Sequence, residues 1–163
     1  MNWLTNLLSV PVQATLRMRL FGLWKIPLIF YVKPSVVAID REKIVVKVPF
    51  RRRNKNHLGS MYFGTMCVGA DCSGGLLAMR LIDANPARIA LIFKDLKADF
   101  LKRAEGDTFF TCTQGREISE LVDAASGSDE RQEMVMTIVA TVPDTFGEEP
   151  VATFDMTLSL KKR

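Results

Sequence analysis

The stretch NHLGSMYFGTMCVGADCSGG, residues 56–75, decides the fold because it is long, mostly apolar and helical in its period. One face of the expected helix carries residues at steps of four and three, which are Met61, Thr65, Val68, Cys72, Leu76 and Met79. The other faces are also nearly uncharged, and a helix that is apolar on all sides is buried on all sides. We therefore predict a central buried helix from about Leu58 to Ile82.

Small residues interrupt this apolar segment at six positions, which are Gly64, Gly69, Ala70, Ser73, Gly74 and Gly75. A glycine inside a helix costs up to about 1 kcal/mol relative to alanine. The missing side chains let another part of the backbone approach closely. The small residues therefore predict that a sheet wraps tightly around the helix.

Strand patterns flank the predicted helix on both sides. Residues 34–50 contain two apolar, alternating stretches separated by a polar turn at 40–43, which is typical of a hairpin. After Asn85-Pro86, four more strand-like stretches follow, with a short helix predicted at 117–125. Strands grouped around a single helix indicate an α+β fold with an antiparallel sheet.

We predict two parts in this chain of 163 residues. Residues 34–163 form a domain in which a curved antiparallel sheet of about six strands surrounds the helix, and residues 1–33 form a helical extension packed on it. The extension has no uncharged run longer than residues 1–16, whereas a spanning helix needs about 20 apolar residues. It also lacks the features of a signal peptide. We therefore expect no transmembrane segment and a cytoplasmic location.

The same extension carries a pattern that favours weak contact with a membrane surface as a minor alternative. The apolar and basic residues of this pattern are Trp3, Leu4, Leu7, Leu8, Arg17 and Arg19. Residues 1–57 together hold eleven Lys or Arg and two acids, a net charge of +9, whereas the rest of the chain has a net charge of −5. The first third therefore predicts either an anion-facing edge or an ordinary solvated basic surface.

The three cysteines limit the metal and redox chemistry. Cys67, Cys72 and Cys112 form neither a CxxC motif nor a cluster with the single histidine, His57. A zinc site is therefore not expected, and an odd number of cysteines gives no support to a disulfide framework.

The spacing of several residues resembles that of hotdog acyl-CoA thioesterases of the phenylacetate-pathway type. In that family an Asn in the entry loop precedes a His-Gly-Gly helix start by six residues, and an Ala-Asp or Ala-Glu pair follows nine residues after that His. The matching positions here are Asn56, Tyr62-Phe63-Gly64 and Ala70-Asp71. Tyr62 and Phe63 depart from the family pattern, because they stand where it has His and the first Gly.

A second stretch also resembles this family. FKDLKADFLKRAEGD, residues 93–107, is similar to its third strand, which ends in a Phe-Leu-x-x-Ala-x-Gly-Asp pattern. The likeness covers roughly residues 34–161. It implies the hotdog fold, in which a curved antiparallel sheet wraps one long helix.

The resemblance implies a thioesterase that hydrolyses an acyl-CoA or acyl-carrier thioester. Asp71 would be the general base or the nucleophile, and Asn56 would orient the water or the carbonyl. A backbone N–H near Phe63 or Gly64 would stabilise the oxyanion. Asp71 lies about two turns, or ~10 Å, from Gly64 along the helix. In the resembled family the site lies between two subunits, so the implied pair is Asp71 of one chain with Asn56 and Gly64 of the other.

Side chains near these positions are candidates for binding the substrate. His57 and Tyr62 lie beside the proposed catalytic positions, and Arg53, Lys102 and Arg103 would receive the phosphates of coenzyme A. Coenzyme A is part of the substrate, so no cofactor is expected. The resemblance further implies a homodimer or a dimer of dimers and a role in lipid metabolism.

Three other functions remain open. A non-catalytic hotdog protein that binds acyl thioesters or fatty acyl ligands is the main alternative, because of the altered helix start. A hydratase or dehydratase would need a catalytic histidine, and His57 lies in a polar loop without the expected context. Nucleic-acid binding is not expected, because RRRNK at 51–55 is one short run without interleaved aromatic residues.

Overall fold

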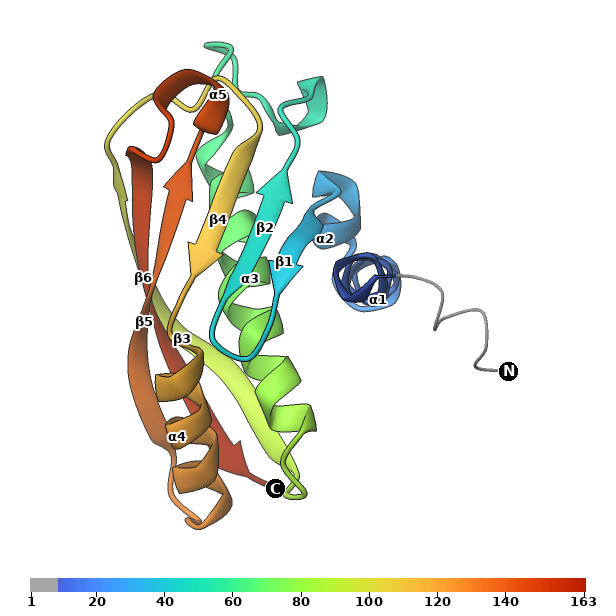
Figure 1. Cartoon of the computed structure of the whole chain (residues 1–163), viewed down its shortest axis with the longest axis vertical. Helices are drawn as coiled ribbons and strands as arrows, with labels where there is room; N and C mark the ends of the chain where they lie inside the picture. Colours follow the sequence, from blue (N-terminus) through green and yellow to red (C-terminus); the bar gives the residue numbers. More distant parts are fainter. Residues whose placement is uncertain (1–8) are drawn as a thin grey trace.

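A six-stranded antiparallel sheet wraps around one long helix (Figure 1). The computed structural model describes residues 9–163. Its strands pair in the order β1-β2-β4-β5-β6-β3, with bounds β1 (Ser35–Ile39), β2 (Ile44–Val48), β3 (Ile89–Phe100), β4 (Thr108–Cys112), β5 (Gln132–Thr141) and β6 (Pro150–Lys162). The helices are α1 (Val10–Trp24), α2 (Pro27–Val32), α3 (Phe63–Asp83), α4 (Gly115–Ser126) and α5 (Pro143–Phe146), with a 3-10 turn η2 (Arg52–Asn54). This is the hotdog fold, and the predicted fold class is confirmed.

The central helix α3 begins at Phe63, with Tyr62 as its N-cap. The start near Leu58 that was predicted from the apolar pattern was wrong, whereas the start at Tyr62-Phe63-Gly64 implied by the resemblance agrees with the structure. The residues before α3 form a turn, in which the side chain of Asn56 accepts hydrogen bonds from the backbone N–H groups of Leu58 and Ser60. A β-bridge between Lys55 and Met61 closes the turn. Among the described residues, α3 alone is long and apolar enough to cross a membrane, and it is also the helix that the sheet encloses.

Small residues place α3 directly against the sheet. A side chain on Gly69 would overlap the ring of Phe110 in β4, and one on Gly74 would meet the sulfur of Met136 in β5. Between them, Ser73 donates a hydrogen bond to the carbonyl oxygen of Phe110 at 3.3 Å. The sheet therefore packs closely on α3, but the atoms nearest Gly69 and Gly74 belong to side chains rather than to the backbone as predicted.

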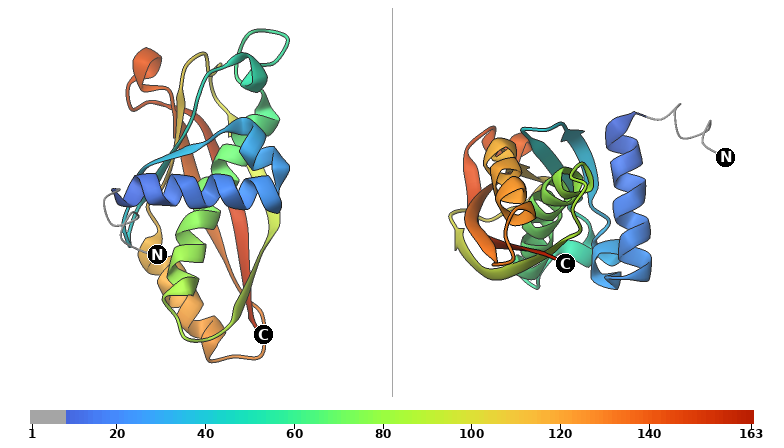
Figure 2. Two further views of the ribbon diagram at one scale, coloured as in Figure 1. Left: turned by 90° about the vertical axis from the view of Figure 1, so that its right-hand side faces the viewer. Right: turned by 90° about the horizontal axis from the view of Figure 1, so that it is seen from below.

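Helix α1 lies on the outside of the molecule, across α3 and beside β1 (Figure 2). Two polar contacts attach it to the chain that follows. The backbone N–H of Val36 donates to Oγ1 of Thr15 at 2.8 Å, and Nε of Arg19 donates to the carbonyl oxygen of Pro34 at 3.0 Å. Residues 1–8, which include Trp3, Leu4, Leu7 and Leu8 of the predicted membrane-surface pattern, lie outside the described residues. The division of the chain at residue 34 stays a prediction.

Strand β3 forms an open edge of the sheet, because it is last in the strand order and pairs with β6 alone among the described strands. It is a long strand with a register shift between Phe93 and Leu96. Several of its apolar side chains are exposed, including those of Ile92, Leu96 and Phe100. A long apolar edge of this kind is a surface on which another strand can pair.

Candidate functional site

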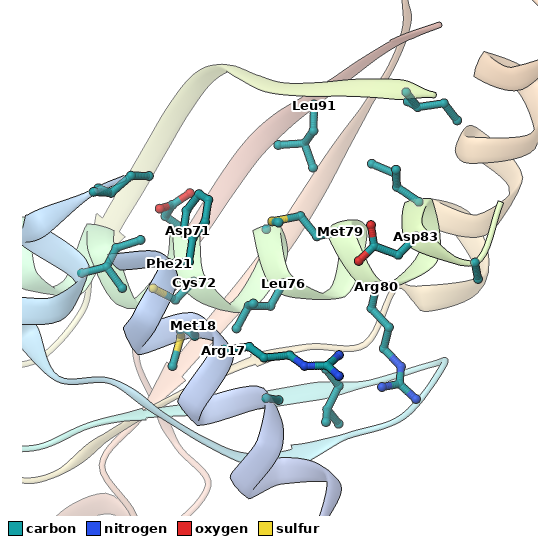
Figure 3. A pocket seen from close by; sticks show the side chains of 18 of the residues that line it. Arg17, Met18, Phe21, Asp71, Cys72, Leu76, Met79, Arg80, Asp83 and Leu91 are labelled. Atoms are coloured by element: carbon teal, nitrogen blue, oxygen red, sulfur yellow. The ribbon is translucent and has the colours of Figure 1, made fainter. Parts of the chain in front are cut away.

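A cavity of about 1160 Å³ lies between α1, α3 and β3 (Figure 3). Its wall is largely apolar, with Phe21 from α1, Leu76 and Met79 from α3, and Leu91 from β3. Small-molecule sites are typically concave and apolar, with a few polar groups that fix the ligand. The cavity has this character, and one of its polar groups is the carboxylate of Asp71.

Asp71 is a partly buried acid near the middle of α3. Within residues 9–163 its carboxylate has no hydrogen-bond or ion-pair partner. Burial raises the pKa of Asp71 above the usual range of an aspartate, because removal from water disfavours the charged form. A carboxylate without a partner in an apolar cavity is unfavourable for stability, and such groups are characteristic of functional sites.

Glycine gives the carboxylate its space. Gly75 lies one turn after Asp71 on the same side of α3, and a side chain there would reach 3.8 Å from Oδ1 of Asp71 and 3.6 Å from the ring of Phe93. Without that side chain, the cavity extends along α3 from Asp71 past Gly75.

The thiol beside this acid is unsuited to act as a nucleophile. Cys72 also lines the cavity. Burial, and secondarily the charge of Asp71, raise the pKa of Cys72 far above the usual range. Only a thiolate is strongly nucleophilic, so Cys72 is a poor candidate for a nucleophile in this wall.

Three arginines also line the cavity, and the sequence analysis missed all of them. Arg17 comes from α1, Arg80 from α3 and Arg163 from the end of the chain, and Figure 3 shows the first two. Among the described residues none of the three forms a salt bridge. Guanidinium groups bind phosphates and carboxylates well, so the cavity suits a ligand with an apolar part and an anionic part.

The other residues predicted to be catalytic lie away from this cavity. Asn56, Phe63 and Gly64 are at the start of α3, and none of them lines the cavity that contains Asp71. Within one chain, therefore, the structure does not bring Asp71 together with the start of α3. Their catalytic roles stay predictions.

Aromatic rings cover the start of α3. The ring of Tyr62 packs so closely that a side chain on Gly64 would lie 2.6 Å from one of its carbon atoms. Tyr62 and Phe63 have ring centroids 4.8 Å apart, and Phe63 also contacts Phe100 of β3. Tyr62 makes no side-chain capping bond, so the first backbone N–H groups of the helix are uncapped.

The entry loop uses its asparagines for structure. Nδ2 of Asn56 donates to Oγ of Ser60, while its Oδ1 serves the turn already described. Asn54, which the sequence analysis did not consider, is fully buried and donates from Nδ2 to the carbonyl oxygens of Val32 and Pro49. Its Oδ1 is buried without a partner. His57 is exposed in the same loop.

Two of the three basic residues predicted to bind phosphates are paired with acids. Lys102 forms an ion pair with Glu149, and Arg103 forms one with Glu105 at 3.1 Å. Arg53 has no acidic partner among the described residues. It donates to the backbone oxygen of Tyr31, and its guanidinium lies 5.7 Å from the centre of that ring.

The described residues contain no group of three or more His, Cys, Asp or Glu side chains that could hold a metal ion. The charged side chains that line the cavity are those of Asp71, Asp83, Arg17, Arg80 and Arg163.

Comparisons with known proteins agree with the fold. A family model described as a domain of unknown function, DUF4442, matches residues 16–160. A Pseudomonas aeruginosa protein of unknown function, described as a probable thioesterase, superposes with a TM-score of 0.76 at 23% identity, over 91% of this chain and 96% of that one. A Chlorobaculum tepidum protein of unknown function has a TM-score of 0.77 at 11% identity, with 94% and 97% of the two chains covered.

A Haemophilus influenzae thioesterase is also similar, with a TM-score of 0.64 at 16% identity over 88% of each chain. No curated protein matches the sequence. At these identities the structural matches show a shared fold, and the chemistry has to be argued from the site.

Proposed function

We propose that this chain, which belongs to the DUF4442 family, hydrolyses acyl thioesters with Asp71 as its catalytic carboxylate. One observation carries the proposal: an acid without a partner faces a large apolar cavity in a hotdog fold. The similar structures described as thioesterases support the same reaction class.

The chemistry requires few groups. In one form of the reaction, Asp71 takes a proton from water as the water attacks the thioester carbonyl, and in the other its carboxylate attacks directly. The thiol leaves as a thiolate without a general acid, because thiol pKa values are about 8.5. The raised pKa of Asp71 makes it a stronger base than an ordinary aspartate. Neither a cofactor nor a metal enters the proposal.

The oxyanion would form at the start of α3 in a second copy of the chain. The N–H groups of Phe63 and Gly64 are uncapped there, and the helix dipole favours negative charge. Asp71 is two turns further along its own helix, which is ~10 Å. We therefore propose a homodimer, alone or within a dimer of dimers, with Asn56 and Gly64 supplied by the partner. The open edge of β3 offers a surface for this pairing.

The apolar and the basic residues of the cavity would bind different parts of the substrate. The apolar wall takes the acyl chain, and Arg17, Arg80 and Arg163 take the phosphates of coenzyme A or another anionic group. Arg53 remains a further candidate for these phosphates, because it has no acidic partner among the described residues. Lys102 and Arg103 are weaker candidates, since binding there would compete with their ion pairs.

The direct test measures release of free thiol from a panel of acyl-CoA substrates. We expect Asp71→Asn to lower kcat/KM by at least ~100-fold, as loss of a general base does. Asp83→Asn is the matched control, because Asp83 is a second acid of the same cavity, and it should change the rate little. The wild-type rate should rise with pH through the raised pKa of Asp71, because only the carboxylate is basic. Equal rates for Asp71→Asn and wild type would remove Asp71 from the reaction.

A carrier or sensor of acyl thioesters is the second candidate. The Tyr62 ring over Gly64 favours it, because the ring restricts access of a carbonyl to the helix start. Tight binding of an acyl-CoA to the wild type without any thiol release would select this function. His57 and Tyr62 would then contribute to binding alone.

A further inference from the structure

Helix α1 has an apolar stripe on its outer side. Val12, Leu16, Leu20 and Leu23 follow one another at steps of four, four and three, so they share one face, and all four are exposed. The opposite side packs inward through Met18 and Gly22. A helix so rich in apolar residues is normally covered, yet α1, which also carries Arg17 and Arg19, lies on the outside of the molecule (Figure 2).

Exposed apolar side chains are also present at the end of α1 and on α2, which packs against α1. Trp24 at the end of α1 is 79% exposed, and Leu28, Phe30 and Tyr31 of α2 are exposed as well. We call this surface, from Val12 to Tyr31 on the outer side of both helices, the α1–α2 face. Single exposed apolar side chains are ordinary, but a continuous group of them marks an interaction surface.

The charges around the α1–α2 face are positive. Lys25 and Lys33 end α1 and α2 and lie beside this face, whereas Arg17 lies on the side of α1 that lines the Asp71 cavity. Arg51 and the η2 residues Arg52 and Arg53 adjoin Tyr31, around a hollow of about 560 Å³. The first acid after residue 8 is Asp40. Within residues 9–163 none of these cations forms a salt bridge. The partner of this face should therefore be both apolar and anionic.

We infer that the α1–α2 face docks this protein on an anionic lipid bilayer. The leucines and Trp24 would enter the boundary between headgroups and acyl chains, where the aromatic rings of Trp and Tyr are favoured. The lysines and arginines would lie at the level of the anionic headgroups.

A second copy of the chain fits this face less well. A twofold interface would oppose the face with itself and bring its unpaired cations together. Like charges across an interface cost several kcal/mol. An anionic bilayer satisfies the apolar stripe and the cations at once, and this proposal does not depend on the chemistry of Asp71.

Co-sedimentation with vesicles tests the docking. The full-length protein should bind vesicles of phosphatidylglycerol mixed with phosphatidylcholine and bind those of phosphatidylcholine alone much less. Leu20→Glu should weaken binding at least ~10-fold, because a charge enters the apolar layer. Val135→Glu on β5 is the matched control, since Val135 and Leu20 are equally exposed, at 56% and 57%. It should bind like wild type, and thermal unfolding should show both variants folded.

A second set of variants tests the contribution of the basic residues to vesicle binding. Arg52→Glu should weaken binding by ~10-fold or more, whereas Lys161→Glu on β6 should not, and salt should weaken the wild type. In a Trp3→Phe variant, Trp24 is the only tryptophan, and its emission should shift to the blue on vesicles. The Asp71→Asn variant should bind vesicles like the wild type. The vesicle assay therefore tests the docking separately from the proposed hydrolysis.

Three outcomes would overturn the inference. The first is no binding of the wild type to the anionic vesicles, and the second is equal binding of Leu20→Glu and the wild type. The third is a Leu20→Glu variant that binds vesicles normally and dissociates into smaller species, since that would assign the face to a second copy of the chain.

Discussion

Helices α1 and α3 are both mostly apolar, but only α3 is enclosed. The sheet surrounds α3, and residues such as Ala70 and Leu77 are completely buried. Helix α1 lies outside, with only Met18 and Gly22 buried. An apolar composition therefore indicates that a helix will be buried against something. It does not indicate whether the surface that buries it belongs to the same chain.

The two helices are also held differently. The small residues of α3 fit it closely to β4 and β5, so its position depends on shape. Helix α1 depends more on polar contacts from Thr15 and Arg19 to the segment before and within β1. A change in shape should therefore damage α3 most, and the loss of one hydrogen bond should loosen α1 alone.

The largest stability effect is expected for Gly69→Ala. The added methyl group would overlap the ring of Phe110, which is completely buried. Overpacking of this kind costs about 1–3 kcal/mol, so we expect the free energy of unfolding to fall by about 2 kcal/mol. In a chain of this size, that lowers Tm by about 4–8 °C. Chemical and thermal denaturation would measure it.

Gly75→Ala is the matched control on the same helix. The new methyl group would lie 3.6 Å from the nearest atom of Phe93, which is an ordinary contact. The gain in helix propensity is up to about 1 kcal/mol, so the variant should be as stable as the wild type or slightly more. Equal losses for the two variants would contradict the view that close fit against Phe110 positions α3.

Much of the fold could be predicted from the sequence, because period and alternation report burial directly. The helical spacing located α3, and the alternation in strands such as β6 located the sheet. The apolar pattern misplaced the start of α3 because Leu58 and Met61 continue it. In the structure the Asn56 side chain holds Leu58 and Ser60 in a turn, and the backbone N–H of Met61 donates to the carbonyl oxygen of Ala104. A local hydrogen bond of this kind leaves no trace in a hydrophobic pattern.

The candidate site was only partly predictable. The spacing pointed to Asp71, and its place in an apolar cavity agrees with that choice. Arg17, Arg80 and Arg163 were missed because α1, α3 and the end of the chain border one cavity only in the folded structure. Residues that are distant in sequence and share no motif give no signal before the tertiary structure is known.

Asp71→Asn should change stability less than Gly69→Ala does, and it should stabilise the protein rather than destabilise it. An unpaired buried acid destabilises the enclosed helix, and its removal should raise the free energy of unfolding at pH 7 by about 1 kcal/mol. The pH dependence has a definite sign. Since the folded pKa is raised above about 3.9, the native state binds more protons between these two pKa values, and wild-type stability falls as pH rises through that window.

The gain from Asp71→Asn should therefore be absent below about pH 4 and complete above the raised pKa. Urea denaturation of both proteins across this range would measure it. Asp83→Asn is the control, because Asp83 is exposed at the end of α3, and its effect should not follow this pH dependence. Loss of stability in Asp71→Asn at neutral pH would mean that the carboxylate has a stabilising partner, as a structural acid would.

The smallest change in the free energy of unfolding is expected for Thr15→Val. This variant should also show the difference between α1 and α3 most clearly. Valine keeps the shape of threonine but removes the oxygen that accepts the Val36 N–H bond. Because α1 lies outside, it can move away and let water reach that N–H, so the free energy of unfolding should change by less than about 0.5 kcal/mol. Amide hydrogen exchange should nevertheless speed up in α1 while α3 stays protected.

Thr137→Val on β5, which removes an exposed hydrogen bond to Asp155, should leave α1 unchanged. If α1 and α3 lost protection together, α1 would be an integral part of the core, and the contrast between the two helices would fail.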